Sequence, residues 1–157
     1  MGDYQPEAST ATHVIRETIA SRRDSVDEAS ERLIQAFAAL PCVRGSLDDI
    51  SLALSEALAN AVVHGNREDP DKTVDVYAAC EGPDQCTLVI TDEGQGFDPE
   101  AVANPTAAEN LLSSHGRRLF LIRQLMDQTE IKLGGRQIVL RKRCQDSSGH
   151  CSVLPVA

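Results

Sequence analysis

Three polar side chains recur at four-residue intervals within the segment 46–64: Glu56, Asn60 and His64. In a helix this spacing places them on one stripe, with a drift of about 40° at each step. A carboxylate one turn before a carboxamide suits a hydrated metal ion, because Asn offers a neutral oxygen to Mg²⁺ and Glu can orient or deprotonate an attacking nucleophile. Taken alone, the same spacing is also typical of a solvated helix face.

A second group, Asp92, Gly94 and Gly96, directly follows the apolar run 86–91. Two glycines spaced two residues apart let the backbone turn sharply and approach a ligand closely. An aspartate at the end of a strand can accept a hydrogen bond from an exocyclic amine such as that of adenine. A tight turn explains the same residues, although these glycines open a long loop rather than close a hairpin.

A third group, Gly116, Arg117 and Arg118, stands immediately before the helical pattern 119–126. The N-terminus of a helix attracts anions, and two guanidinium groups beside it strengthen the attraction for a polyphosphate. An ordinary helix start with solvated arginines explains these residues equally well. Each of the three groups therefore has both a chemical and a purely structural interpretation when it is considered alone.

The elements that must position these groups follow from the apolar periodicity. Strands are predicted where β-branched residues gather, and helices where apolar residues recur every three or four positions after a capping serine. In chain order these are a strand Thr12–Ala20, a helix from the cap Ser25 to about Leu40, a helix from the cap Ser46 to about His64, strands Thr73–Ala79 and Cys86–Asp92, a loop at 93–115, a helix Arg117–Met126, and hairpin strands Thr129–Leu133 and Gln137–Lys142. This order predicts an α/β (α+β) fold, a two-layer sandwich in which helices cover one face of a mixed, mostly antiparallel sheet.

Length and composition predict one soluble domain. The 157 residues are 41% apolar and 25% charged, as in ordinary globular proteins, and we expect a domain at 12–143 between tails at 1–11 and 144–157. The net charge of −9 argues against a nucleic-acid binder, because phosphate backbones select clustered Lys and Arg. The chain has no apolar run long enough for a bilayer and begins with no signal-peptide pattern, so we expect a cytoplasmic protein.

The five cysteines form no CxxC pair, and their number is odd. Both features favour reduced thiols in a cytosolic protein. Cys144, His150 and Cys151 are spaced closely enough to suggest a metal cluster, but the surrounding composition is typical of a disordered tail. We therefore expect no metal site there.

The three motifs in this order resemble the N box, G1 box and G2 box of the GHKL (gyrase–histidine kinase) ATPase superfamily. The matching segments are 55–66 (SEALANAVVHGN), 92–97 (DEGQGF) and 116–122 (GRRLFLI). The EAxxNAxxHG wording, the short loop between boxes and the small size resemble most the bacterial anti-sigma-factor serine kinases of partner-switching pathways. The resemblance covers about 12–143 and implies the Bergerat ATP-binding fold, with ATP and Mg²⁺ as cofactors.

The resemblance also implies a role for individual residues. Glu56 matches the glutamate that acts as general base, and Asn60 matches the Mg²⁺ ligand. Asp92 matches the aspartate that reads adenine, and residues 98–115 match the lid over the phosphates, with its hinge at Gly116. Arg117 or Arg118 would steady charge on the γ-phosphate. The full set of nucleotide contacts implied is Asn60, His64, Asp92, Gly94, Gly96, Phe97, Gly116, Arg117, Arg118 and Leu119.

Partners follow from the same resemblance: a sigma factor that is sequestered, a small anti-anti-sigma (STAS-type) protein that is phosphorylated, and a second copy in a homodimer. The sequence departs from the family pattern at Arg118, where a second glycine is expected, and at Arg136, where a small hydroxyl residue is expected. These departures favour a second interpretation, a nucleotide-gated binding module with little catalysis. A histidine-kinase-like catalytic domain acting in trans is a third.

Overall fold

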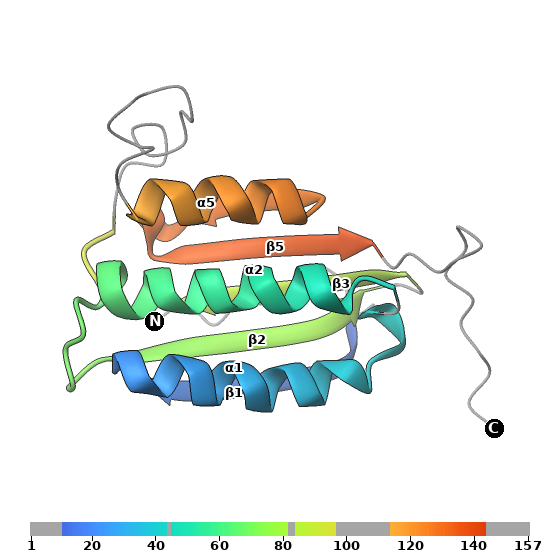
Figure 1. Ribbon diagram of the computed structural model, residues 1–157, viewed down its shortest axis with the longest axis horizontal. Helices are drawn as coiled ribbons and strands as arrows, with labels where there is room; N and C mark the ends of the chain where they lie inside the picture. Colours follow the sequence, from blue (N-terminus) through green and yellow to red (C-terminus); the bar gives the residue numbers. More distant parts are fainter. Residues whose placement is uncertain (1–10, 44, 82–83, 97–113, 144–157) are drawn as a thin grey trace.

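In the described part of the chain, five antiparallel strands form one sheet, and three α-helices cover one of its faces (Figure 1). The computed structural model describes residues 11–43, 45–81, 84–96 and 114–143. The strands lie in the order β1-β2-β3-β5-β4, with β1 Ala11–Ala20, β2 Thr73–Glu81, β3 Gln85–Thr91, β4 Gln128–Lys132 and β5 Gln137–Arg143. The predicted two-layer sandwich is confirmed, and every strand pairing among the described residues is antiparallel rather than mixed.

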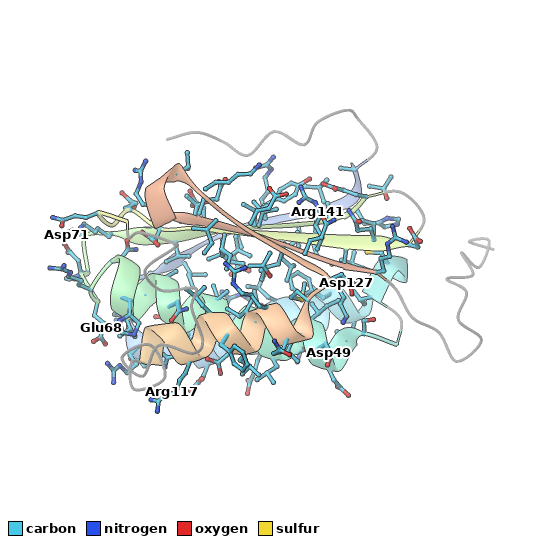
Figure 2. All side chains as sticks on the ribbon, turned by 90° about the horizontal axis from the view of Figure 1, so that it is seen from above. Asp49, Glu68, Asp71, Arg117, Asp127 and Arg141 are labelled. Carbon is cyan, nitrogen blue, oxygen red and sulfur yellow. A yellow bond between two sulfur atoms is a disulfide. The ribbon has the colours of Figure 1, made fainter. Side chains whose placement is uncertain are left out.

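The core lies between this sheet and the helical layer. Alternate residues of β2 point to opposite faces, so that Val74, Val76 and Ala78 join the large apolar core while Tyr77 and Ala79 join a small apolar cluster on the other face. The central strands are buried on both faces, which explains their nearly continuous apolar sequence. Figure 2, seen from above, shows the helices gathered on one side of the sheet.

The helices are α1 Arg23–Ala38, α2 Leu47–Ala59 and α5 Ser114–Leu125, with a 3-10 turn η1 at Pro41–Val43. Each buries a single apolar stripe against the sheet, and α2 lies between the other two (Figure 1). Lys142 on β5 links the C-terminal end of α5 to the N-terminal end of α2. Its Nζ donates to the carbonyl of Leu125 at 2.6 Å and pairs with Asp49 at 3.3 Å. Within the described ranges, no helix has both the length and the apolar character that crossing a bilayer requires.

Two predicted helix starts and one predicted side-chain cap differ from the structure. Helix α1 begins at Arg23 rather than after a cap at Ser25, and the N-cap Arg22 makes no side-chain cap. Ser46 is the N-cap residue of α2, but its hydroxyl donates to the carbonyl of Arg143 at 3.2 Å instead of capping the helix. Helix α5 begins at Ser114, so Gly116 lies in its first turn rather than before it. Local sequence signals specify these helices but not the tertiary partners that their ends acquire.

The cysteine prediction is wrong for one pair, because Cys42 and Cys80 form a disulfide. Cys42 lies in η1 and Cys80 near the end of β2, 38 residues apart, and the fold brings them together at one end of the sheet. Counting cysteines and searching for CxxC does not detect such a long-range pair. Cys86 is a free buried thiol directly opposite Cys80 on β3, and burial raises its pKa to about 12.

Candidate functional site

The helix that carries Glu56, Asn60 and His64 changes its winding in the middle of this motif. The α-helical part of α2 ends at Ala59, and Asn60–Gly65 continue as a π-helix, η2. The wider turn is closed by a hydrogen bond from the Asn66 amide to the Ala61 carbonyl, at 2.8 Å. Such π segments are rare and are frequent at functional sites. The predicted continuous α-helix to His64 is therefore corrected, and the change begins at the predicted metal ligand.

A cavity of about 280 Å³ opens beside this segment. Its lining includes five of the predicted nucleotide contacts: Asn60, His64, Asp92, Gly96 and Leu119. Four other predicted contacts that the structure describes, Gly94, Gly116, Arg117 and Arg118, are not among the residues that line it. The remaining lining residues are Ala57, Ala61, Val63, Gly65, Arg67, Ile90, Ile131, Gly135, Arg136 and Ile138.

Asp92 is held in this wall by close packing against glycines. A Cβ atom on Gly65 would overlap the carboxylate of Asp92, and one on Gly94 would overlap the carbonyl oxygen of Gly65. Gly96 has φ +81 and lies so close to the carbonyl of Gly134 that a Cβ would overlap it. Because real Cβ atoms do not approach so closely, packing requires a glycine at all three positions, and at Gly96 the positive φ is a second reason.

The carboxylate of Asp92 is 8% exposed, and burial raises its pKa to about 6. The Gly94 amide donates to Oδ1 at 2.8 Å, and this bond, with the charges of Arg136 and Lys72, opposes the effect of burial. The Asp92 amide donates to the carbonyl of Arg136 at 2.8 Å, which fixes the residue to the turn before β5. Near neutral pH the site therefore offers a buried carboxylate as hydrogen-bond acceptor.

Asn66, the last residue of the motif segment 55–66, is a positioning residue for this wall. Its side chain is buried and donates to the Ser21 hydroxyl at 2.5 Å and to the Thr73 carbonyl at 2.8 Å. Its Oδ1 accepts from the Glu93 amide at 2.7 Å, next to Asp92. One carboxamide thus joins the end of β1, the start of β2 and the segment after β3. No spacing rule along the sequence detects such a connection.

Glu56 lies one turn before Asn60 but lines a second, more open hollow with Arg117, Arg118 and Leu121. Arg118 Nε donates to Glu56 Oε2 at 3.1 Å, so the pair joins α2 to α5. Arg117 is exposed at the N-terminal end of α5 (Figure 2). Consecutive residues of α5 line the two hollows, Leu119 the first and Arg118 the second.

His64 lines the cavity near these charges. Burial lowers its pKa below the ordinary value, and the positive charges of Arg118 and Arg23 lower it further. The imidazole is therefore neutral at pH 7, and it brings no positive charge to the cavity there. Its place in the cavity agrees with the predicted stripe on α2.

The side chain of Asn60 is a buried carboxamide without a partner among the described residues, as expected of a residue that binds a metal ion or a phosphate group. It is 9% exposed, and neither its Oδ1 nor its Nδ2 has a hydrogen-bond partner among the described residues. Buried carboxamides are normally satisfied, so an orphaned one beside a cavity fits an external ligand. An amide oxygen one turn from a carboxylate is also a donor set that suits Mg²⁺. In the described part of the chain no cluster of three His, Cys, Asp or Glu could hold a metal by itself.

The structure thus brings most of the predicted residues to one end of the molecule, where α2 ends and α5 begins (Figure 1). Phe97, most of the predicted lid, and the cluster at 144–151 lie outside the described residues. Sequence reasoning missed Gly135 and Ile138 as lining residues and gave Arg136 no place in the site. The close approach of the turn Gly134–Gly135 to Gly96 could have been suspected only from its paired glycines.

Comparison with known proteins gives consistent matches. A family model described as the histidine kinase-like ATPase domain matches residues 19–142. A serine-protein kinase RsbW of Bacillus subtilis is 30% identical over 93 residues, 55% of this chain and 57% of that protein. Anti-sigma F factors of Heyndrickxia coagulans and Clostridium beijerinckii are 31% and 29% identical, over 73% and 76% of this chain and 78% and 87% of those proteins. The aligned region therefore spans little more than half of the first relative's length.

Among solved structures, a histidine kinase domain of a blue-light activated histidine kinase from Erythrobacter litoralis matches with a TM-score of 0.46 and 17% identity. The match covers 76% of this chain and 60% of that one.

Proposed function

This chain belongs to the family of histidine kinase-like ATPase domains, and we propose that it is an ATP-dependent protein serine/threonine kinase of the anti-sigma-factor type. The observation that carries the proposal is the pairing of a buried acceptor with an orphaned carboxamide. Asp92 is fixed among glycines in the wall of the cavity, and Asn60, which lines the same cavity, has no hydrogen-bond partner for either polar atom among the described residues. One turn before Asn60 stands Glu56, a candidate general base.

Adenine binding in the proposed site depends on Asp92. Its carboxylate accepts a hydrogen bond from the exocyclic amine of adenine, while the apolar residues Ile90, Ile138 and Leu119 line the same cavity and cover the ring. Guanine presents a carbonyl oxygen where adenine presents its amine. An ionised carboxylate repels that oxygen, so ATP is preferred to GTP.

Phosphate binding in the proposed site depends on residues of two helical segments. Asn60 is the residue that would hold Mg²⁺, whose charge stabilises the phosphates when it is bound. The N-terminus of α5 and the guanidinium of Arg117 favour negative charge at the same end of the cavity. Phosphoryl transfer depends mainly on such positioning and electrostatics.

Transfer requires an acceptor hydroxyl and a base. The seryl or threonyl oxygen of the partner bonds to the γ-phosphorus as the bond to the ADP oxygen breaks, and Glu56 accepts the hydroxyl proton. Glu56 suits this role because it lines an open hollow beside the nucleotide cavity rather than the cavity itself. A partner protein can reach that hollow from solvent.

The names of the relatives support the partner class. Serine-protein kinase RsbW and the anti-sigma F factors are named for phosphorylating serine and for acting on a sigma factor. We extend this to an anti-anti-sigma (STAS-type) substrate and a sequestered sigma factor for this chain, which acts in the cytoplasm, with a homodimer as a further partner state.

The test is incubation with γ-labelled ATP, Mg²⁺ and candidate anti-anti-sigma proteins from the same genome. We expect acid-stable label on a partner serine or threonine, and none with the Glu56→Ala variant. Acid-labile label on a partner histidine would instead support a histidine-kinase-like domain acting in trans. Nucleotide-dependent binding of the partner with no label on it would support the binding module, which the unusual Arg118 and Arg136 favour.

A further inference from the structure

The candidate base does not stand alone, because an arginine from another helix binds it. Arg118 on α5 donates through Nε to Oε2 of Glu56 on α2 at 3.1 Å, across 62 residues of sequence. The side chains are 29% and 25% exposed, so the pair lies at the mouth of the hollow rather than on the open surface. Arg118 also stands where the family resemblance leads one to expect a glycine, which has no side chain to offer.

The geometry of this pair restricts the carboxylate without blocking it. Arg118 donates to Oε2, and within the described residues no hydrogen bond to Oε1 is found, so that Oε1 can accept a proton from a substrate hydroxyl. A long glutamate side chain otherwise samples several rotamers, and holding it in one of them raises the fraction of time spent in a productive position. A guanidinium with a fixed planar fork is better suited to this than a lysine.

The surroundings make the contact specific to Arg118. Arg117, one residue earlier, is exposed, while the charge of Arg118 is felt by His64 as well as by Glu56. Arg118 therefore lies between the nucleotide cavity and the hollow where the partner hydroxyl would arrive. It does not line the nucleotide cavity itself.

We propose that Arg118 is a positioning residue, which holds Glu56 by one carboxylate oxygen so that the other faces the incoming hydroxyl. This inference rests on the proposed function, because it gives Arg118 a role in the same transfer step. It differs from two other roles for Arg118: a direct contact to the γ-phosphate, and a side chain that obstructs closure over the nucleotide.

Steady-state phosphotransfer of five variants separates these roles. Arg118→Ala should lower kcat about tenfold or more while the KM for ATP stays nearly unchanged, because the base is misplaced and the nucleotide is not. Arg118→Lys should recover part of kcat, since it keeps the charge but not the planar fork. The matched control is Arg123→Ala, at an exposed position of the same helix, which should leave both constants as in wild type.

The decisive variant is Arg118→Ala combined with Glu56→Gln. If Arg118 acts through Glu56, the double variant should be no slower than Glu56→Gln alone, because effects on one functional unit are not additive. An equal further loss in the Glu56→Gln background would overturn the proposal, and so would a raised KM for ATP at unchanged kcat. Faster transfer by Arg118→Ala would show that the side chain obstructs.

A second measurement tests the pair without any catalysis. In thermal unfolding, Arg118→Ala and Glu56→Gln should give a combined change in Tm smaller than the sum of the single changes, by roughly 1–3 °C. Additive changes would mean that the pair does not exist in solution. If wild type labels no partner but the changes in Tm are not additive, the proposed function fails while the pair stands.

Discussion

The two ends of the proposed nucleotide site are built by different means. At the adenine end, Asp92 is fixed by backbone contacts: glycines at 65 and 94 pack against it, and two amide hydrogen bonds hold it. At the transfer end, Glu56 and the arginines at 117 and 118 project from two helices into an open hollow, and one partly exposed ion pair joins the helices. Packing and backbone hydrogen bonds thus fix the adenine end, whereas the transfer end consists of charged side chains in an open hollow.

This difference explains where the sequence can depart from its family. A side chain at Gly65 or Gly94 would overlap backbone or carboxylate atoms, so no replacement is tolerated there. At position 118 an arginine replaces the expected glycine, and its guanidinium finds a partner in Glu56. The two ends should therefore respond differently to substitution, and the predictions below test that contrast.

The largest effect is expected at Gly94. Gly94→Ala places a methyl group on the carbonyl oxygen of Gly65, and a backbone atom cannot move aside cheaply, so ATP binding should be lost with about 3 kcal/mol or more of stability. Gly134→Ala is the matched control: its Cβ meets nothing within 4 Å, and only the positive φ should cost about 1 kcal/mol. Calorimetry and thermal unfolding measure both. Equal effects of Gly94→Ala and Gly134→Ala would show that close packing does not fix the adenine end.

A disulfide far from both ends tests whether this rigidity is local. Cys42 and Cys80 lie at the opposite end of the sheet from Asp92, since Cys80 pairs with the first part of β3 and Asp92 follows its end. Closing a 38-residue loop should contribute about 3–4 kcal/mol, so a reducing agent should lower Tm clearly. ATP affinity at 25 °C should stay unchanged. A parallel loss of affinity would mean that the adenine end depends on the whole sheet.

At the transfer end, binding and chemistry should separate. Glu56→Ala should reduce phosphotransfer about 10²-fold, as expected for the loss of a general base, and leave ATP affinity nearly intact. Asn60→Ala should instead remove the dependence of ATP binding on Mg²⁺. Titrations with and without Mg²⁺, beside rate measurements, distinguish the two. If Glu56→Ala weakened ATP binding as much as Gly94→Ala does, the two ends would not be distinct.

The same contrast describes what sequence reasoning reached and what it missed. The helix stripe of Glu56, Asn60 and His64 and the glycines after β3 were predicted, because they depend on local spacing and backbone freedom. The disulfide, the π-helical turn and the contacts of Asn66 were not predicted. Each of these depends on atoms that meet only after the sheet has formed. The ion pair of Arg118 with Glu56 was not predicted either, because the two residues are 62 positions apart and lie on different helices.

The smallest predicted effect is a dependence of ATP affinity on pH, and it belongs to the adenine end alone. Burial raises the pKa of Asp92 to about 6, and ATP binds the ionised carboxylate that accepts its amine. As pH falls from 7 to 5, protonation competes with binding, so affinity should decrease by up to about tenfold. The pKa of His64 is lowered by burial and by the charges of Arg118 and Arg23, and protonation of His64 at lower pH would add positive charge that favours ATP, which gives the opposite sign.

Asp92→Asn separates these two contributions. The variant should bind ATP more weakly at pH 7 by about 1.5–3 kcal/mol, the usual value of a hydrogen bond to a charged group, and its affinity should no longer fall on acidification.

The stability of the free protein gives an independent check. Because the folded pKa of about 6 exceeds the unfolded value of 3.8, Asp92 favours the folded state most at low pH, and this contribution is lost as pH rises through about 6. The free protein should therefore lose stability over the same pH range in which it gains affinity for ATP. Asp92→Asn should abolish both trends, and a variant that kept either one would locate the titrating group elsewhere.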